Sequence, residues 1–229
     1  MSVRSPIRSE LTSRTETRSL SYLVVEGPAG SGKTTLASLL ARKLGGRLML
    51  DRAEENPFLS DFFRDPRRYA FKTQLFFTLS RYMQQEALVQ QDLFHTLLIS
   101  DYLFVRDRIY ASVTLDDREL ALYRKLAALI EGEIPRPDLV IYLQYDADTL
   151  LKALNASGGK STVRTNKEYL IAVVEAYNYY FLHFEEAPIL IVNGMTAGPV
   201  WNADALTDLV RELEKPHSGI GYYSPSLQT

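Results

Sequence analysis

The sequence contains no cysteine, no long hydrophobic run and no strong excess of charge of either sign. Without cysteine, disulfide bonds, thiol catalysis and cysteine-ligated metal centres are excluded. No apolar stretch approaches the roughly 20 residues that a membrane-spanning helix needs. The 26 basic and 28 acidic side chains leave a formal net charge of −2, so charge gives no reason to expect binding to nucleic acid or to an anionic membrane. We therefore expect neither nucleic acid nor membrane as a partner.

The composition that remains is typical of one globular domain. The chain has 229 residues, of which 46% are hydrophobic, and this is enough to bury one sizeable core. Residues 1–19 are rich in Ser, Thr and Arg and lack the apolar stretch of a secretory signal, while Glu10 and Glu16 argue against a transit peptide. We interpret 1–19 as a disordered tail, 20–214 as a single domain and 215–229 as a flexible C-terminal tail. The absence of cysteine is compatible with a reducing compartment, and we expect a cytoplasmic protein.

Short apolar runs alternate with amphipathic stretches along the domain. Strands are expected at 20–26, 47–51, 96–100, 139–143 and 189–192. Helices are expected at 33–44, 58–63, 66–91, 117–131, 166–186 and 202–214, with one more beginning at about 146. This alternation predicts an α/β fold with three layers, in which a five-stranded parallel sheet carries helices on both faces.

The strongest motif lies between the first strand and the first helix. It fits the pattern G-x-x-x-x-G-K-[ST] of the phosphate-binding P-loop, in the required strand–loop–helix context. The residues expected to bind ATP are Gly27, Pro28, Ala29, Gly30, Ser31, Gly32, Lys33, Thr34 and Thr35. Glycines let backbone N–H groups turn toward a phosphate, and the helix N-terminus adds a partial positive charge. We expect Lys33 to reach the β- and γ-phosphates and the Thr34 hydroxyl to bind Mg²⁺.

An acidic residue follows the third expected strand. P-loop proteins usually hold the Mg²⁺ shell with an acid in this position, and Asp101 directly follows the run 96–100. Asp101 is therefore a candidate metal ligand together with Thr34. A helix-capping role is the alternative interpretation.

Further blocks, taken with the P-loop, resemble the deoxynucleoside kinases, particularly the bacterial deoxyadenosine/deoxyguanosine kinase branch. The blocks are Asn56-Pro57-Phe58-Leu59, Gln74 with Arg81 seven positions later, the stretch 101–111 and the stretch 137–143. The resemblance covers about residues 20–195. It implies a P-loop kinase fold, Mg²⁺-dependent transfer of the γ-phosphate of ATP to the 5′-hydroxyl of a deoxyribonucleoside, and a homodimer.

The resemblance also implies roles for individual side chains. Asp51 corresponds to the general base, which is normally Glu, and Glu54 and Glu55 are the alternatives. Gln74 corresponds to the amide that pairs with the nucleobase, and Arg81 to the arginine near the 5′ end of the nucleoside. Without the resemblance, both would be interpreted as helix-surface residues. Phe58, Phe71, Phe76, Phe77 and Tyr82 can form a stacking wall for the base, or can simply be core.

Two stretches depart from the family pattern. After the third strand the family has an acid followed by Arg and Ser, but residues 100–102 of this chain read Ser-Asp-Tyr and lack the arginine. Arg106 or Arg108 is expected to supply the missing positive charge, and Arg106 is also expected to contact substrate. The lid at about 156–165 keeps only Lys160 and Arg164 as cations, and Arg164 is the candidate for stabilising the transferred phosphoryl group. This cation-poor lid leaves open the alternative of an ATP-binding regulatory subunit. The P-loop does not identify the acceptor, so a kinase of another acceptor, such as a nucleoside monophosphate, is also open.

Overall fold

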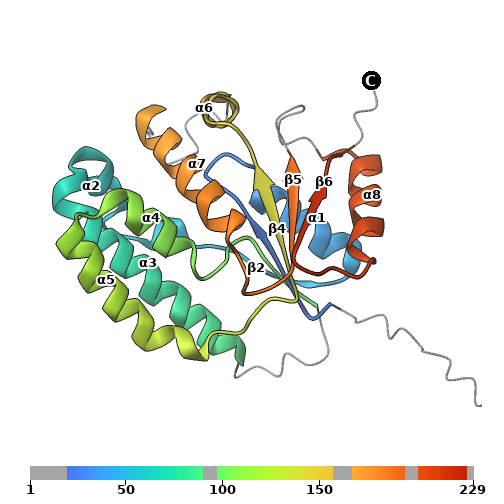
Figure 1. Cartoon of the computed structure of the whole chain (residues 1–229), viewed down its shortest axis with the longest axis horizontal. Helices are drawn as coiled ribbons and strands as arrows, with labels where there is room; N and C mark the ends of the chain where they lie inside the picture. The colour runs from blue at the N-terminus through green and yellow to red at the C-terminus, as the bar shows by residue number, and fades with distance from the viewer. Residues whose placement is uncertain (1–19, 90–96, 157–166, 194–200, 226–229) are drawn as a thin grey trace, which may run out of the picture.

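The computed structural model describes residues 20–89, 97–156, 167–193 and 201–225. Within these residues, a twisted sheet lies between two layers of helices (Figure 1). The expected tail at 1–19 and nearly all of the expected lid, including Lys160 and Arg164, lie outside the described residues. None of the helices in the described part is long and apolar enough to cross a membrane.

Among the described residues, the sheet has six strands rather than the five expected. They are β1 (Tyr22–Glu26), β2 (Arg47–Met49), β3 (Leu98–Ser100), β4 (Leu139–Gln144), β5 (Ile189–Asn193) and β6 (Ile220–Tyr223). All neighbours are parallel, in the order β2-β3-β1-β4-β5-β6. The arrangement is the expected α/β architecture.

The sixth strand lies in the segment that the sequence marks as a flexible tail. Ile220 pairs with Ile189 and Tyr223 with Val192, so β6 covers the edge of the buried strand β5. Its residues alternate between exposed and half-buried, as an edge strand requires. This strand has only four residues and directly follows a segment with Pro, Ser and Gly, so its pattern of apolar residues is too short to predict a strand.

Helices cover both faces of the sheet. One face packs on α1 (Lys33–Leu44) and α8 (Ala203–Leu213), and the other on α4 (Arg106–Thr114) and α7 (Lys167–Leu182) (Figure 1). Further out, α2 (Leu59–Arg64), α3 (Pro66–Val89) and α5 (Asp117–Ile130) pack around α4. The remaining helices are α6 (Ala147–Ala156) and the short 3₁₀ turns η1 (Ala53–Glu55) and η3 (Glu131–Glu133).

The central strand β1 explains why its sequence is continuously apolar. Leu23 and Val25 join the cluster beneath α1 and α8, whereas Tyr22 and Val24 join the cluster beneath α4 and α7. A parallel strand covered on both faces needs apolar side chains at every position. The charged residue that ends β1, Glu26, is therefore an exception that needs a buried partner.

Strand register brings three chain segments together at one end of the sheet. Val24 of β1 and Met49 of β2 both align with Ser100 of β3. The residues that leave the carboxyl ends of these strands therefore meet in one place, which is where ligands bind in open parallel sheets.

Candidate active site

The P-loop connects β1 to α1 and has the backbone geometry of an anion-binding loop. Gly30 and Gly32 have φ of +86° and +79°, which a side chain would strain. A Cβ on Gly27 would lie 2.6 Å from Ser31 Oγ and 3.1 Å from the Leu143 carbonyl oxygen, so alanine there would require Ser31 to shift. No side chain caps the start of α1, and Ser31 Oγ is buried without a hydrogen-bond partner among the described residues. These free donors fit a phosphate group.

Lys33 is held in a setting that favours the arrival of an anion. Burial lowers the pKa of its ammonium group from 10.5 to about 8, and the nearby Arg106 adds to this effect. The carboxylates of Glu26, Asp101 and Asp51 act in the opposite direction. A phosphate would remove much of the cost of keeping Lys33 charged.

Asp101 joins the P-loop to the segment after β2. Its Oδ2 accepts a short hydrogen bond from the Thr34 hydroxyl, and its Oδ1 accepts one from the Asp51 backbone N–H at 2.7 Å. Thr34 and Asp101 thus present two hard oxygen ligands side by side. The described residues contain no group of three or more acidic or histidine side chains placed to hold a metal. A Mg²⁺ ion would fit here if phosphate oxygens and water completed its shell, as this ion prefers.

A buried chain of alternating charges crosses the site. Arg106 donates to Glu26 through Nε at 3.0 and 3.2 Å and through Nη2 at 2.8 Å, and to Asp51 Oδ2 through Nη1 at 2.9 Å. Arg81 donates to the same Asp51 oxygen at 2.8 Å and makes a shorter ion pair with Asp107. Both arginines are only 4% exposed, so the pairs are shielded from water.

The chain of charges sets the ionisation of Asp51. Burial alone would raise the pKa of this carboxyl group, but the Arg81 and Arg106 guanidinium groups outweigh it and hold the pKa below its ordinary value. Asp51 is therefore a carboxylate at neutral pH, able to accept a proton. Arg108, the other candidate for the missing charge, pairs with Glu131 away from these groups.

Sequence reasoning missed Glu26 and Asp107. Glu26 is fully buried, and besides Arg106 it accepts hydrogen bonds from the backbone N–H groups of Gly27 and Leu103. A charged residue at the end of a buried strand is the signal that could have drawn attention to it. Asp107 sits on α4 beside Arg106 and carries no comparable signal in the sequence.

A small pocket adjoins Asp51 and has the residues expected around a nucleoside. Its volume is about 170 Å³, and its lining includes Lys33, Asp51, Gln74, Arg81 and Arg106. These are the site candidates that the structure brings together. Its aromatic lining consists of Phe62, Phe63, Phe77, Tyr110 and Tyr169.

The predicted contact of Phe58 with substrate stays a prediction, and the structure places this ring beside Phe76. Phe58 is absent from the described lining of the small pocket, and its ring meets Phe76 edge-on with centroids 6.5 Å apart. Asn56 accounts for this placement, because its Oδ1 accepts from the Phe58 backbone N–H while its Nδ2 donates to the Thr73 carbonyl oxygen. Of the five aromatic candidates, Phe77 lines the pocket, with the Arg81 guanidinium 4.9 Å from its ring centre.

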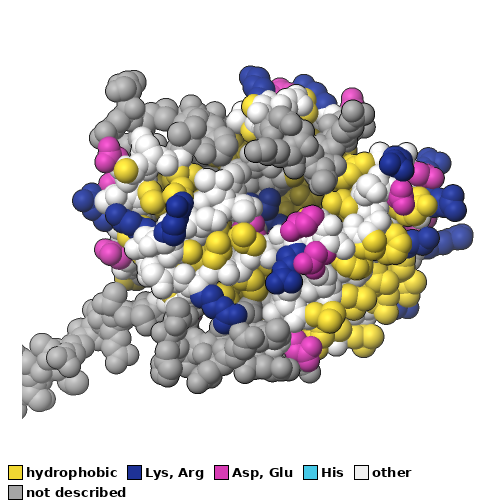
Figure 2. All heavy atoms as spheres, turned by 180° about the vertical axis from the view of Figure 1, so that it is seen from behind, with side chains coloured by type: hydrophobic (Ala, Val, Ile, Leu, Met, Phe, Trp, Pro, Cys, Tyr) yellow, Lys and Arg dark blue, Asp and Glu magenta, His cyan; other side chains and the backbone are white. Residues whose placement is uncertain are grey.

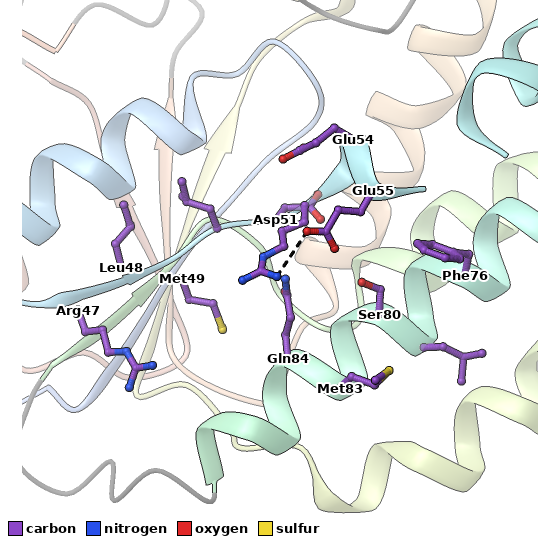
Figure 3. Close-up of a pocket in the computed structure, with 13 residues that line it drawn as sticks. Arg47, Leu48, Met49, Asp51, Glu54, Glu55, Phe76, Ser80, Met83 and Gln84 are labelled. Carbon is purple, nitrogen blue, oxygen red and sulfur yellow. Dashed lines mark hydrogen bonds and ion pairs between the residues drawn. The ribbon is translucent and has the colours of Figure 1, made fainter. Parts of the chain in front are cut away.

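A larger hollow lies on the other side of Asp51, between the edge strand β2 and α3 (Figure 3). Its volume is about 1060 Å³, and Glu54 and Glu55 belong to its lining rather than to the small pocket. Glu55 pairs with the exposed Arg52 at 3.4 Å. Because this hollow lacks the P-loop residues, the small pocket is the candidate site of reaction and Asp51 its candidate base.

The P-loop, the parallel sheet and the buried carboxylate beside the pocket define a P-loop phosphotransferase. A model of the deoxynucleoside kinase family matches residues 23–215 of the chain. The chain therefore belongs to the deoxynucleoside kinase family.

Curated relatives and solved structures agree with this assignment. The chain is 30% identical to a deoxyguanosine kinase of Bacillus subtilis over 178 residues, which cover 76% of this chain and 86% of the relative. It is 26% identical to a deoxyadenosine kinase of Lactobacillus acidophilus over 213 residues, covering 88% and 99%. The fold matches a deoxyadenosine kinase from M. mycoides with bound dCTP, with a TM-score of 0.70 at 20% identity, covering 84% of this chain and 97% of the other.

Proposed function

We propose that this chain is a deoxynucleoside kinase that transfers the γ-phosphoryl group of ATP to the 5′-hydroxyl of a deoxyribonucleoside, as in nucleotide salvage. The observation that carries the proposal is Asp51. This ionised carboxylate lines the same pocket as the P-loop lysine Lys33 and the amide of Gln74. A base, a phosphate-binding group and a group suited to a nucleobase therefore line one small pocket.

The chemistry follows from these contacts. The Asp51 carboxylate takes the proton of the 5′-hydroxyl as that oxygen bonds to the γ-phosphorus, while the bond from the γ-phosphorus to the bridging oxygen of ADP breaks. Arg81 and Arg106 hold Asp51 in place through their hydrogen bonds. Lys33 and the first amides of α1 stabilise the negative charge on the phosphates.

Two further groups belong to the proposed machinery. Thr34 and Asp101 would hold Mg²⁺, which when bound neutralises phosphate oxygens. Arg164 lies outside the described residues, and we assign it the task of bringing a cation to the transferred phosphoryl group. In the described part of the site, the guanidinium groups of Arg81 and Arg106 are already paired with carboxylates, which leaves this task to another cation.

A phosphoryl-transfer screen tests the proposal. Purified protein is given Mg²⁺ and ATP with each of the four deoxynucleosides and, separately, their monophosphates, and Lys33→Ala serves as the control. Turnover of a deoxynucleoside that Lys33→Ala abolishes is the expected result. Turnover of monophosphates alone would move the acceptor to a nucleotide, and ATP binding without any turnover would make the chain a regulatory subunit.

We also propose that the chain forms a homodimer. In Figure 2, hydrophobic side chains gather over α3 and α5, and the large exposed ones on these helices are Leu79, Met83, Leu122 and Leu129. Met83 is 67% exposed and Leu129 is 81% exposed, which is costly for side chains of this size in water. Light scattering after size exclusion should give twice the 26.0 kDa chain mass. Leu129→Glu should give the single-chain mass, and a wild-type protein of 26.0 kDa would refute the proposal.

We place the enzyme in the cytoplasm, because a chain without cysteine suits a reducing compartment and the proposed reaction consumes ATP. Fractionation of cells that carry the full chain with a C-terminal tag tests this placement, and recovery in a membrane or secreted fraction would contradict it.

A further inference from the structure

Two side-chain pairs connect α3 to α4 along one wall of the small pocket. Arg81 pairs with Asp107, and Gln74 Nε2 donates to Thr114 Oγ1 at 3.2 Å. Gln74 and Arg81 are seven residues apart on α3, and Asp107 and Thr114 are seven residues apart on α4. The two helices therefore run in opposite directions here, with one pair two turns above the other.

The Gln74–Thr114 pair has a fixed polarity. A threonine hydroxyl carries one proton, and Thr114 gives it to the carbonyl oxygen of Tyr110 at 2.8 Å. Toward Gln74, the Thr114 oxygen can then only accept. The NH₂ group of the Gln74 amide must face Thr114, and the amide oxygen must face the other way.

This polarity leaves the Gln74 amide oxygen without a partner, and the same wall holds a second unpaired acceptor. Gln74 Oε1 and Asp107 Oδ2 are both buried, and neither has a hydrogen-bond partner among the described residues. Gln74 and Asp107 both line the small pocket. Buried acceptors without donors are costly, so this wall is suited to a ligand that brings N–H groups to it.

We propose that Thr114 is a specificity-determining positioning residue: its hydroxyl fixes which end of the Gln74 amide faces the nucleobase and so selects bases with an exocyclic amino group. The inference rests on the proposed function, because it takes the small pocket to be the nucleoside site. An exocyclic amino group brings an N–H donor to the Gln74 amide oxygen. The second N–H of the Gln74 amide remains available for the ring nitrogen beside that amino group.

The proposal can be tested with pairs of nucleosides that differ only in which of two neighbouring base positions is the hydrogen-bond donor and which is the acceptor. Deoxyadenosine has an amino group beside an acceptor nitrogen, whereas deoxyinosine has a carbonyl oxygen beside an N–H. Deoxycytidine and deoxyuridine differ in the same way. If the amide could turn by 180°, it would meet the carbonyl member of either pair equally well.

The experiment compares the wild type with Thr114→Val, which keeps the shape and removes the hydroxyl, and with Thr114→Ser, which restores it. Both kcat/KM and the nucleoside Kd are measured for the two pairs. In the wild type, we expect the amino member to be preferred by at least about tenfold, the effect of one mispaired hydrogen bond. Thr114→Val should reduce that preference by about tenfold, mainly through KM, and Thr114→Ser should restore it.

A matched control lies on the facing helix. The Thr78 hydroxyl donates to the backbone carbonyl oxygen of Gln74 at 3.0 Å and lies 2.8 Å from the Tyr123 hydroxyl. Among the described residues it makes no hydrogen bond to the Gln74 side-chain amide, and Thr78 is absent from the lining of the pocket. Thr78→Val therefore removes a buried hydroxyl from the same region and should leave the preference between the members of each pair unchanged.

The possible failures are distinct. A wild type that prefers the carbonyl members, or a Thr114→Val protein with unchanged preference, overturns the role of Thr114 and leaves the proposed kinase activity standing. A protein that binds nucleosides without transferring phosphate refutes the proposed function, while the Kd ratios still decide the role of Thr114. A protein that binds no nucleoside refutes both.

Discussion

Replacing Arg106 should destabilise the protein more than any surface arginine can, because it would leave the fully buried Glu26 without its guanidinium partner. In Arg106→Met, Glu26 loses three hydrogen-bond contacts and Asp51 loses one of its two arginine partners. Removing one partner of a buried ion pair costs about 3–5 kcal/mol. For a chain of this size, that corresponds to a fall in Tm of roughly 6–20 °C.

The assay is urea unfolding followed by circular dichroism, arranged as a double-mutant cycle with Glu26→Gln. Glutamine in place of Glu26 removes the stranded charge, so the double variant should be more stable than the sum of the single losses by at least about 1.5 kcal/mol. The control is Arg108→Met, on the same helix, because the Arg108 side chain is 41% exposed and that of its partner Glu131 is 19% exposed. That loss should be smaller than the loss in Arg106→Met, since solvent reaches Arg108 and partly screens the pair.

Additive losses in the cycle, or equal losses for Arg106→Met and Arg108→Met, would refute the reasoning. Either result would mean that Glu26 finds enough compensation from its backbone donors and the Tyr177 hydroxyl alone. A coupling of the expected size would show that the charge at the end of β1 depends on α4.

Three other predictions follow from the site. Asp51→Asn should lower kcat by about 10²–10⁴-fold while ATP binding is kept, and Glu54→Gln, in the larger hollow, should leave kcat nearly unchanged, as steady-state kinetics will measure. At pH 8, ATP binding should take up about half a proton. The Lys33 ammonium group, with a pKa of about 8, is half deprotonated in the ATP-free protein, and the bound phosphates raise this pKa. Calorimetry in buffers of different ionisation enthalpy measures the proton uptake, and the same uptake in Lys33→Arg would contradict the assignment to Lys33. Gly30→Ala should lower Tm more than Gly45→Ala. Both glycines have positive φ, but of the two only Gly30 has neighbours that a Cβ would meet, Leu154 at 3.0 Å and the Leu150 carbonyl oxygen at 3.2 Å. Equal changes in Tm would disprove this packing argument.

Local patterns were sufficient for most of the fold. The five predicted strands and the P-loop helix were recognisable because each has a largely apolar run or a helical period, and all but the strand at 96–100 lie within two residues of Gly or Pro. The strand β6 was not predictable, because it depends on pairing with β5 rather than on its own four residues. The helix α4 was equally hard to delimit, since its first turn carries Arg106, Asp107 and Arg108, which look like surface charges.

The candidate site also has a part that the sequence predicts and a part that it does not. Lys33, Thr34 and Asp101 follow from a motif of adjacent residues and a strand end, and the structure brings them together. The partnership of Glu26 and Arg106 joins residues 80 positions apart, so no sequence spacing reveals it. No sequence pattern points to Thr114, because the role that we propose for it depends on its hydroxyl donating to the Tyr110 carbonyl oxygen.

The alignment of the strands has a consequence for how this chain tolerates change. Glu26 and Asp51 each lie two residues beyond the row in which Val24, Met49 and Ser100 are paired, and Asp101 lies one residue beyond it. Asp51 follows β2 by two residues, so a one-residue insertion within β2 would shift Asp51 by one position relative to Arg81 and Arg106, unless the strand changed its register and turned its side chains to the opposite face. Insertions and deletions should therefore be admitted in the loops far from this end, whereas between residues 47 and 51 even a single added alanine should abolish activity in a protein that still folds.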